Sequence, residues 1–334
     1  MTRLGVSLPF LRPLALDEYI GLAREAEARG YDTIWTGESA GADAITTMTV
    51  LATHTTRVQI ASGVIPVQIR TPQILGQTAT TLGHLAPGRI CLGLGISSRI
   101  IVGDWHGLPF TRPLEQLREA IALIRLVLSG ERVNFEGRHY RAKNFRLSMP
   151  PAPAPVRIYM AALGPRMLEL AGEVADGVLL NWLPPEAVPP SIQRIEAGAK
   201  KAGRNLADFE LAAFIRTAVT NEVEPVRQTL ARDITSYATV DSYARFFADS
   251  GYAPEVEKVN AAWRAGDRAQ AVKEISGRFL DGLGVVGPED FCRDRIAQYA
   301  RAGLTQPVVL PFPGGADPRE TLFRTVRAFG REPR

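Results

Sequence analysis

Residues 57–98, RVQIASGVIPVQIRTPQILGQTATTLGHLAPGRICLGLGISS, predict a strand, a helix and a second strand in direct succession. The first part is rich in β-branched residues and carries Gly63 where a strand would end. Thr71 offers a hydroxyl for a helix N-cap, and Pro72 suits the first helical position. A second apolar strand follows at 89–96. Because a helix joins the two strands, we expect them to be parallel and adjacent.

The same alternation of strand and helix patterns continues on both sides of this stretch. Strands are expected at 3–8, 33–37, 58–65, 89–96, 156–161, 177–180, 209–219 and 307–312. Eight strands alternating with helices predict an α/β fold of the (β/α)8 TIM-barrel type rather than a doubly wound sheet. We interpret 1–334 as a single domain, with a hairpin and Pro-rich excursion at 131–155 and a helical insertion at 222–282, after strand seven.

Composition excludes several classes of function. The net charge is +4, but acidic and basic residues are interleaved without a basic tract, so we expect no nucleic-acid partner. No apolar run reaches about 18 residues, and no signal peptide is recognisable, so we expect no membrane association. The two cysteines, Cys91 and Cys292, lie far apart and indicate no disulfide framework. These features predict a cytoplasmic protein that acts on a small molecule.

Function in such barrels collects at the carboxyl ends of the strands, and that rule gives the candidate site. The candidates are Ser7, Glu38, Ser39, Gly63, Val64, Ile65, Ser97, Ser98, Ala162, Leu163, Gly164, Pro165, Arg166, Asn181, Trp182 and Arg216. At 162–166 a Gly-Pro helix start leaves backbone N–H groups for an anion, although such starts also occur without a ligand. The GLGIS segment lacks the third glycine of a dinucleotide fingerprint, and no zinc or serine-hydrolase motif occurs, so no metal is expected.

Six stretches in order carry a resemblance to a known family. They are RLGVSLPF, GYDTIWTGES, GVIPVQIRTP, LAPGRICLGLGISS, IYMAALGPRMLELAGEVADGVLLNW and VVGPEDFCRDRIAQYARAG. Together they span nearly the whole chain and resemble the luciferase-like monooxygenase superfamily of flavin and deazaflavin barrels. Within it, the chain is most similar to the oxidoreductases that use coenzyme F420, including methylenetetrahydromethanopterin reductase-like proteins.

The resemblance implies a cofactor, a reaction and an assembly. The cofactor would be coenzyme F420, with FMN as the alternative, and the reaction a hydride transfer to or from a small organic substrate. The strand-end residues given above, from Ser7 to Asn181, would bind the cofactor. A cis peptide between Gly63 and Val64 would support its ring, whereas an ordinary β-bulge is the alternative reading. The turn 162–166 would approach its phosphate, and the protein would be a homodimer.

The sequence also differs from its relatives at the positions that serve there as acid or base. Relatives acting on glucose 6-phosphate carry Asp-His where Glu38-Ser39 stands and Glu where Ser98 stands, so that sugar chemistry is not expected here. Glu38 and His106 remain the candidate catalytic residues; the alternatives are a rim ion pair for Glu38 and a loop anchor for His106. An FMN-dependent luciferase-type monooxygenase and a non-catalytic cofactor-binding protein stay open as functions.

Overall fold

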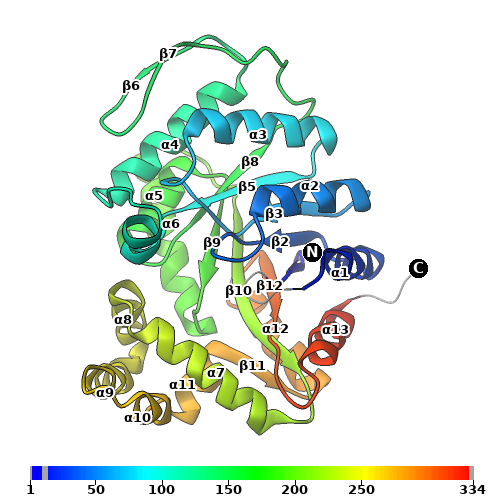
Figure 1. Ribbon diagram of the computed structural model, residues 1–334, viewed down its shortest axis with the longest axis vertical. Coiled ribbons are helices and arrows are strands. Elements are labelled where there is room, and N and C mark those ends of the chain that lie inside the picture. The colour runs from blue at the N-terminus through cyan, green and yellow to red at the C-terminus, as the bar shows by residue number, and fades with distance from the viewer. Residues whose placement is uncertain (1, 10–13, 331–334) are drawn as a thin grey trace.

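The computed structural model describes residues 2–9 and 14–330, so Phe10 of the RLGVSLPF stretch lies outside it. Eight parallel strands close into a barrel because β1 pairs with β12 and β9 with β10, which confirms the predicted TIM barrel (Figure 1). In spatial order they are β1 (Gly5–Ser7), β2 (Thr33–Thr36), β3 (Gln59–Ser62), β5 (Ile90–Gly95), β8 (Arg157–Ala161), β9 (Gly177–Asn181), β10 (Glu210–Val219) and β12 (Gln306–Pro311).

Helices surround the barrel and bury their apolar faces against it (Figure 1). They are α1 (Leu16–Ala28), α2 (Ala44–His54), α3 (Pro72–Leu85), α4 (Pro113–Leu128), α5 (Pro165–Val174), α6 (Val188–Lys201), α12 (Glu289–Arg301) and α13 (Pro318–Phe329). Local chemistry sets their ends as predicted: the Thr71 hydroxyl accepts a hydrogen bond from Ile74 N–H, and Pro72 begins α3. Gly30 follows α1 with φ +73°, a conformation that favours glycine.

Side chains fill the barrel interior. Trp35, Tyr159 and Phe214 pack there, with Phe214 edge-on to Trp35 at 5.9 Å between ring centres. At the amino-terminal end, the buried carboxylate of Glu210 accepts hydrogen bonds from Arg3 at 2.8 Å and Arg157 at 3.2 Å. It also accepts bonds from the Tyr159 hydroxyl and the Gln306 amide. This network occupies the amino-terminal end of the barrel, whereas the ligand sites of such barrels lie at the opposite end.

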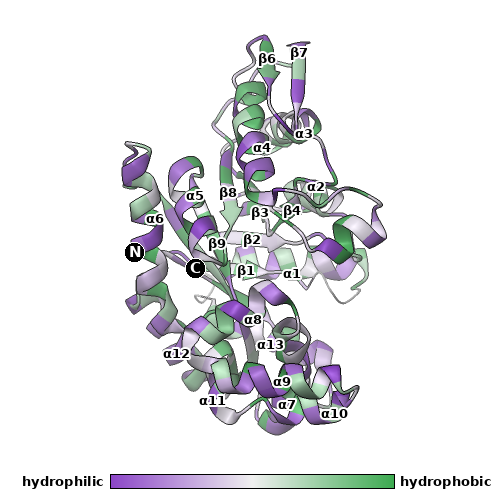
Figure 2. Cartoon of the chain, turned by 90° about the vertical axis from the view of Figure 1, so that its left-hand side faces the viewer, coloured by the Kyte–Doolittle hydropathy of each residue, from purple (hydrophilic) through white to green (hydrophobic). Residues whose placement is uncertain are grey.

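Two excursions lie at opposite ends of the long axis (Figures 1 and 2). One is the predicted hairpin, β6 (Val133–Glu136) and β7 (Arg141–Phe145). The other is the predicted insertion after β10, which has its own apolar core. It contains α7 (Val223–Ala238), α8 (Asp241–Phe247), the π-helical η3 (Ala248–Tyr252), α9 (Ala253–Arg264), α10 (Arg268–Lys273) and α11 (Gly277–Leu283).

Two elements differ from the sequence-based expectation. A short strand, β11 (Gly284–Gly287), extends the sheet beside the end of β10 and was missed because GVVG directly follows a helix without a turn signal. The segment 99–112, expected to be irregular, contains a π-helix, η1 (Ile100–Trp105). A single turn of this kind leaves no apolar periodicity to read. Among the described residues, no helix combines the length and hydropathy needed to cross a membrane.

Candidate functional site

The carboxyl ends of the eight barrel strands, with the loops that follow them, form what we call the barrel mouth. Ser7 ends β1 and is fully buried, and its hydroxyl donates to the Leu8 carbonyl at 3.3 Å. Glu38 and Ser39 follow β2, Gly63 and Val64 follow β3, and Ile65 begins β4. Ser97 and Ser98 follow β5, and 162–166 follows β8. Asn181 ends β9, Trp182 follows it, and Arg216 lies near the end of β10. The parallel closed sheet therefore brings the predicted cofactor-binding residues to one end of the barrel.

The peptide bond between Gly63 and Val64 is cis, which confirms the expectation from the resemblance. β3 stops at Ser62, and pairing resumes at β4 (Ile65–Pro66), beside β5. Ser62 fixes this step, since its hydroxyl donates to the Gly93 carbonyl at 2.9 Å and accepts from the Gly93 N–H at 2.8 Å. A Cβ on Gly63 would lie 2.5 Å from the Phe214 ring. The bulge thus packs directly against the barrel interior.

Glu38 is held at the mouth by an arginine that sequence reasoning missed. Arg70 Nη2 donates to Glu38 Oε1 at 3.0 Å and also bonds Asp43. Burial works to lower the pKa of Arg70, but Glu38 and Asp43 raise it above its usual value. The ion pair matches the alternative reading of Glu38, yet its second oxygen, Oε2, is buried without a hydrogen-bond partner. Glu38 therefore keeps one acceptor for a ligand.

Buried side-chain atoms that lack hydrogen bonds concentrate at the mouth. In the described part of the chain they are Glu38 Oε2, Gln68 Nε2 and Oε1, Arg70 Nε, Trp182 Nε1, Arg216 Nε and His139 Nε2. All of them except His139 Nε2 belong to strand ends or loops of the barrel mouth. Buried polar groups normally find partners, and each unsatisfied group costs about 1–3 kcal/mol. Their concentration at one end therefore indicates a place where a polar ligand binds.

The serines and the histidine of the next loop lie nearer the surface. Ser39, Ser97 and Ser98 are half-buried, and the Ser98 hydroxyl accepts a hydrogen bond from the Ile101 N–H at 3.2 Å, at the start of η1. His106 follows η1 with an exposed side chain. The structure therefore places Ser98 at the mouth and His106 on its outer rim, and the role of His106 stays a prediction.

The turn 162–166 connects β8 to α5. Gly164 is the N-cap residue of α5, and no side chain caps this helix. A Cβ built on Gly164 meets nothing within 4 Å, so the space over the turn is open. Arg166 is exposed beside it. An uncapped N-terminus with open space and a nearby cation suits an anionic group, and the phosphate-binding role of this turn stays a prediction.

A cavity of about 650 Å³ adjoins this turn rather than the centre of the mouth. Leu163 and Pro165 line one wall, and the insertion supplies Tyr252 and Arg278 on the other. The insertion therefore forms part of the wall around the turn. Its helices have no motif that would have revealed this from the sequence.

Asn181, at the end of β9, connects to a buried arginine. Its Oδ1 accepts from Arg216 Nη1 at 2.5 Å, and its Nδ2 donates to the Tyr243 hydroxyl at 3.0 Å. Burial lowers the pKa of Arg216 and raises that of Tyr243 to about 12. The side chains of Asn181 and Arg216 therefore lie in one network. The sequence identified them only as residues near the ends of two separate strands.

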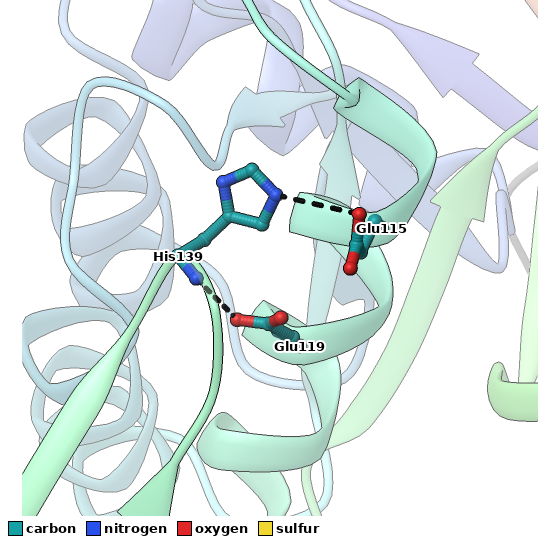
Figure 3. A group of neighbouring side chains, drawn as sticks. All are labelled: Glu115, Glu119 and His139. Atoms are coloured by element: carbon teal, nitrogen blue, oxygen red, sulfur yellow. Dashed lines mark hydrogen bonds and ion pairs between the residues drawn. The ribbon is translucent and has the colours of Figure 1, made fainter.

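Glu115, Glu119 and His139 form the one group of possible metal ligands in the described residues (Figure 3). Glu119 accepts the backbone N–H groups of Arg138, His139 and Tyr140, at 2.9, 2.8 and 3.2 Å. Burial acts to raise the pKa of Glu119, but these hydrogen bonds outweigh it and hold the pKa below its usual value. Glu115 pairs with Arg112 and Arg138. The carboxylates are thus occupied in fastening the hairpin to α4.

Comparison with known proteins places this geometry in a family. The sequence profile described as luciferase-like monooxygenase matches residues 2–306. A putative coenzyme F420-dependent oxidoreductase of Mycobacterium tuberculosis is 29% identical, with 92% of this chain and 94% of that protein covered. The 5,10-methylenetetrahydromethanopterin reductase of Methanolobus tindarius is also 29% identical, with 93% of each covered. The structure of the coenzyme F420 dependent tetrahydromethanopterin reductase of Methanopyrus kandleri superimposes with a TM-score of 0.83 at 24% identity, over 99% of both chains.

Proposed function

The chain belongs to the luciferase-like monooxygenase family, and we propose that it is an oxidoreductase that transfers a hydride between coenzyme F420 and a small organic substrate. The observation that carries the proposal is the set of unsatisfied buried polar atoms at the mouth. The F420-dependent relatives, which cover nearly the whole chain, support the choice of cofactor.

The residues present fit a deazaflavin. The pyrimidine edge of such a ring offers carbonyl oxygens and an N–H group, and the free Gln68 amide offers one donor and one acceptor to match them. The open turn at Gly164 suits a phosphate. Bound at this site, the cofactor would supply the hydride chemistry, while the chain binds it, orients it and excludes water. Glu38 Oε2 would accept a hydrogen bond from the ligand or from a water.

Replacing Gln68 by Ala tests the fit directly. We expect coenzyme F420 to bind about three- to tenfold more weakly, because a lost hydrogen bond is worth about 0.5–1.5 kcal/mol. Thermal stability should be unchanged or slightly higher, since the buried amide has no partner in the free protein. Equilibrium titration and thermal unfolding measure the two quantities.

Gln77→Ala, on the exposed face of α3, is the matched control and should change neither quantity. If Gln68→Ala binds the cofactor as the parent does, Gln68 is not a ligand contact. If the parent protein itself does not bind coenzyme F420, the proposed function fails.

We propose that His106 supplies the proton and that Glu38 holds the ligand. Hydride transfer to a polar double bond leaves an anion, and a positioned acid contributes roughly 10²–10⁴-fold to its protonation. Serine at positions 39 and 98 is a poor proton carrier near neutral pH, and Glu38 is paired with Arg70. The imidazole of His106 can both donate and accept a proton, but it must move inward from the rim to do so.

The corresponding variants are His106→Gln and Glu38→Gln. We expect the first to slow single-turnover hydride transfer and leave cofactor affinity intact, and the second to weaken affinity. Parent-like transfer by His106→Gln across pH 6 to 9 would show that His106 is not the acid. If Glu38→Gln also behaves as the parent, the proton comes from water.

An FMN-dependent monooxygenase remains the second candidate, because the family profile is described as luciferase-like monooxygenase. A homodimer and a cytoplasmic location stay predictions.

A further inference from the structure

Two buried N–H groups lie together beneath the insertion, at the ends of β9 and β10. Trp182 is 1% exposed and Arg216 is 3% exposed. The guanidinium carbon of Arg216 lies 3.4 Å from the centre of the Trp182 ring. Trp182 Nε1 and Arg216 Nε both lack a hydrogen-bond partner. Two such donors in one small volume are unusual in a protein interior, where buried donors are normally satisfied.

The backbone supports a specialised role for this place. Trp182 adopts φ +55°, in the left-handed region that bulky residues rarely enter. Residues held in such conformations cluster at ligand sites. Asn181, the preceding residue, fixes Arg216 through the 2.5 Å bond described above. The indole and the guanidinium are therefore held in a defined orientation before any ligand arrives.

The insertion covers this pair. Tyr237 of α7 lies 5.1 Å from the Trp182 ring and 5.6 Å from the Arg216 guanidinium. Asp233 of the same helix approaches Arg216 Nε, with its carboxylate 3.7 Å away, beyond hydrogen-bond distance. The carboxylate offsets part of the charge, so a neutral carbonyl oxygen and a carboxylate oxygen are both acceptable partners. The aromatic neighbours exclude water and strengthen such a bond.

We propose that the N–H groups of Trp182 and Arg216 Nε together bind a carbonyl or carboxylate oxygen of the ligand in the barrel mouth. The inference rests on the proposed function only in taking the mouth as the ligand site. The oxygen belongs either to the cofactor or to the substrate, and the insertion thereby takes part in recognition. The chain offers a matched pair for comparison: Arg268 stacks on Trp263 at 3.5 Å, on the insertion and away from the mouth.

The test follows the indole N–H signals of the four tryptophans in ¹⁵N-labelled protein. Trp182→Phe and Trp263→Phe assign two of the signals, and Trp182→Phe keeps a ring for Arg216 to stack on. The probes are coenzyme F420 alone, then acetate and acetone added to the F420 mixture. A Trp182 signal that moves with F420 identifies a cofactor oxygen. A signal that moves only with acetate or acetone identifies a substrate oxygen. The Trp263 signal should stay in place throughout.

Affinity gives the second readout. We expect Trp182→Phe to bind the probe that moves the signal about three- to tenfold more weakly, and Trp263→Phe to bind it as the parent does. Arg216→Lys, which removes Nε–H and keeps the charge, should weaken binding similarly if it folds. A Trp182 signal that no probe moves, with parent-like affinity in Trp182→Phe, would mean that no ligand oxygen reaches these donors and would overturn the proposal. If F420 fails to bind but acetate or acetone moves the signal, the proposal stands and the cofactor assignment fails.

Discussion

Gly93→Ala is expected to destabilise the protein by about 3 kcal/mol or more, at the upper end of the cost of overpacking a core. A Cβ at this position would overlap the backbone oxygen of Ser62 on the neighbouring strand β3. A flexible side chain could move away, but this oxygen belongs to the barrel wall. Ser62 also exchanges two hydrogen bonds with Gly93, which would have to lengthen together. Relief therefore requires β3 and β5 to separate.

Chemical denaturation with circular dichroism measures the loss in the free energy of unfolding. Gly21→Ala is the matched control, because a Cβ there meets nothing within 4 Å and the residue lies on the exposed face of α1. The control should not lower stability, since alanine favours a helix interior over glycine by about 1 kcal/mol. A Gly93→Ala protein as stable as the control would show that the two strands are not packed as tightly as described.

The fold could be predicted from the sequence because its signals are local. The strand, cap and helix pattern of 57–98 recurs along the chain. Eight such units bury their apolar faces most simply when their strands close into a barrel. The Thr71 cap and the glycine after α1 lie where the sequence placed them. The short strand β11 was not predicted, because four residues after a helix carry too little periodicity to distinguish a strand from a turn.

The site could be predicted only as a set of positions. Strand-end counting found Glu38, Asn181 and Arg216, since the barrel fixes where strands end. The partners that give these residues their chemistry come from distant segments. Arg70 reaches Glu38 from another loop, and Tyr243 reaches Asn181 from the insertion. Gln68 stood out only when its buried amide proved to have no partner. Such pairings depend on tertiary packing, which leaves no periodic signal.

Preference for coenzyme F420 over FMN is the second large effect we expect, at least tenfold in affinity. Both cofactors carry a flavin-like ring and a phosphate, so the mouth and the turn alone would accept either. FMN ends at its phosphate, whereas coenzyme F420 continues beyond it. The open space at Gly164 and the adjoining cavity of about 650 Å³ give room for that continuation. Resemblance to F420-dependent relatives points the same way.

Parallel titrations of the purified protein with coenzyme F420 and FMN, followed by quenching of tryptophan fluorescence, test this claim most directly. The predicted result is a dissociation constant for coenzyme F420 at least tenfold below that for FMN, which corresponds to about 1.4 kcal/mol of binding free energy. FMN binding tenfold more tightly than coenzyme F420, or a yellow protein that carries FMN as isolated, would contradict it.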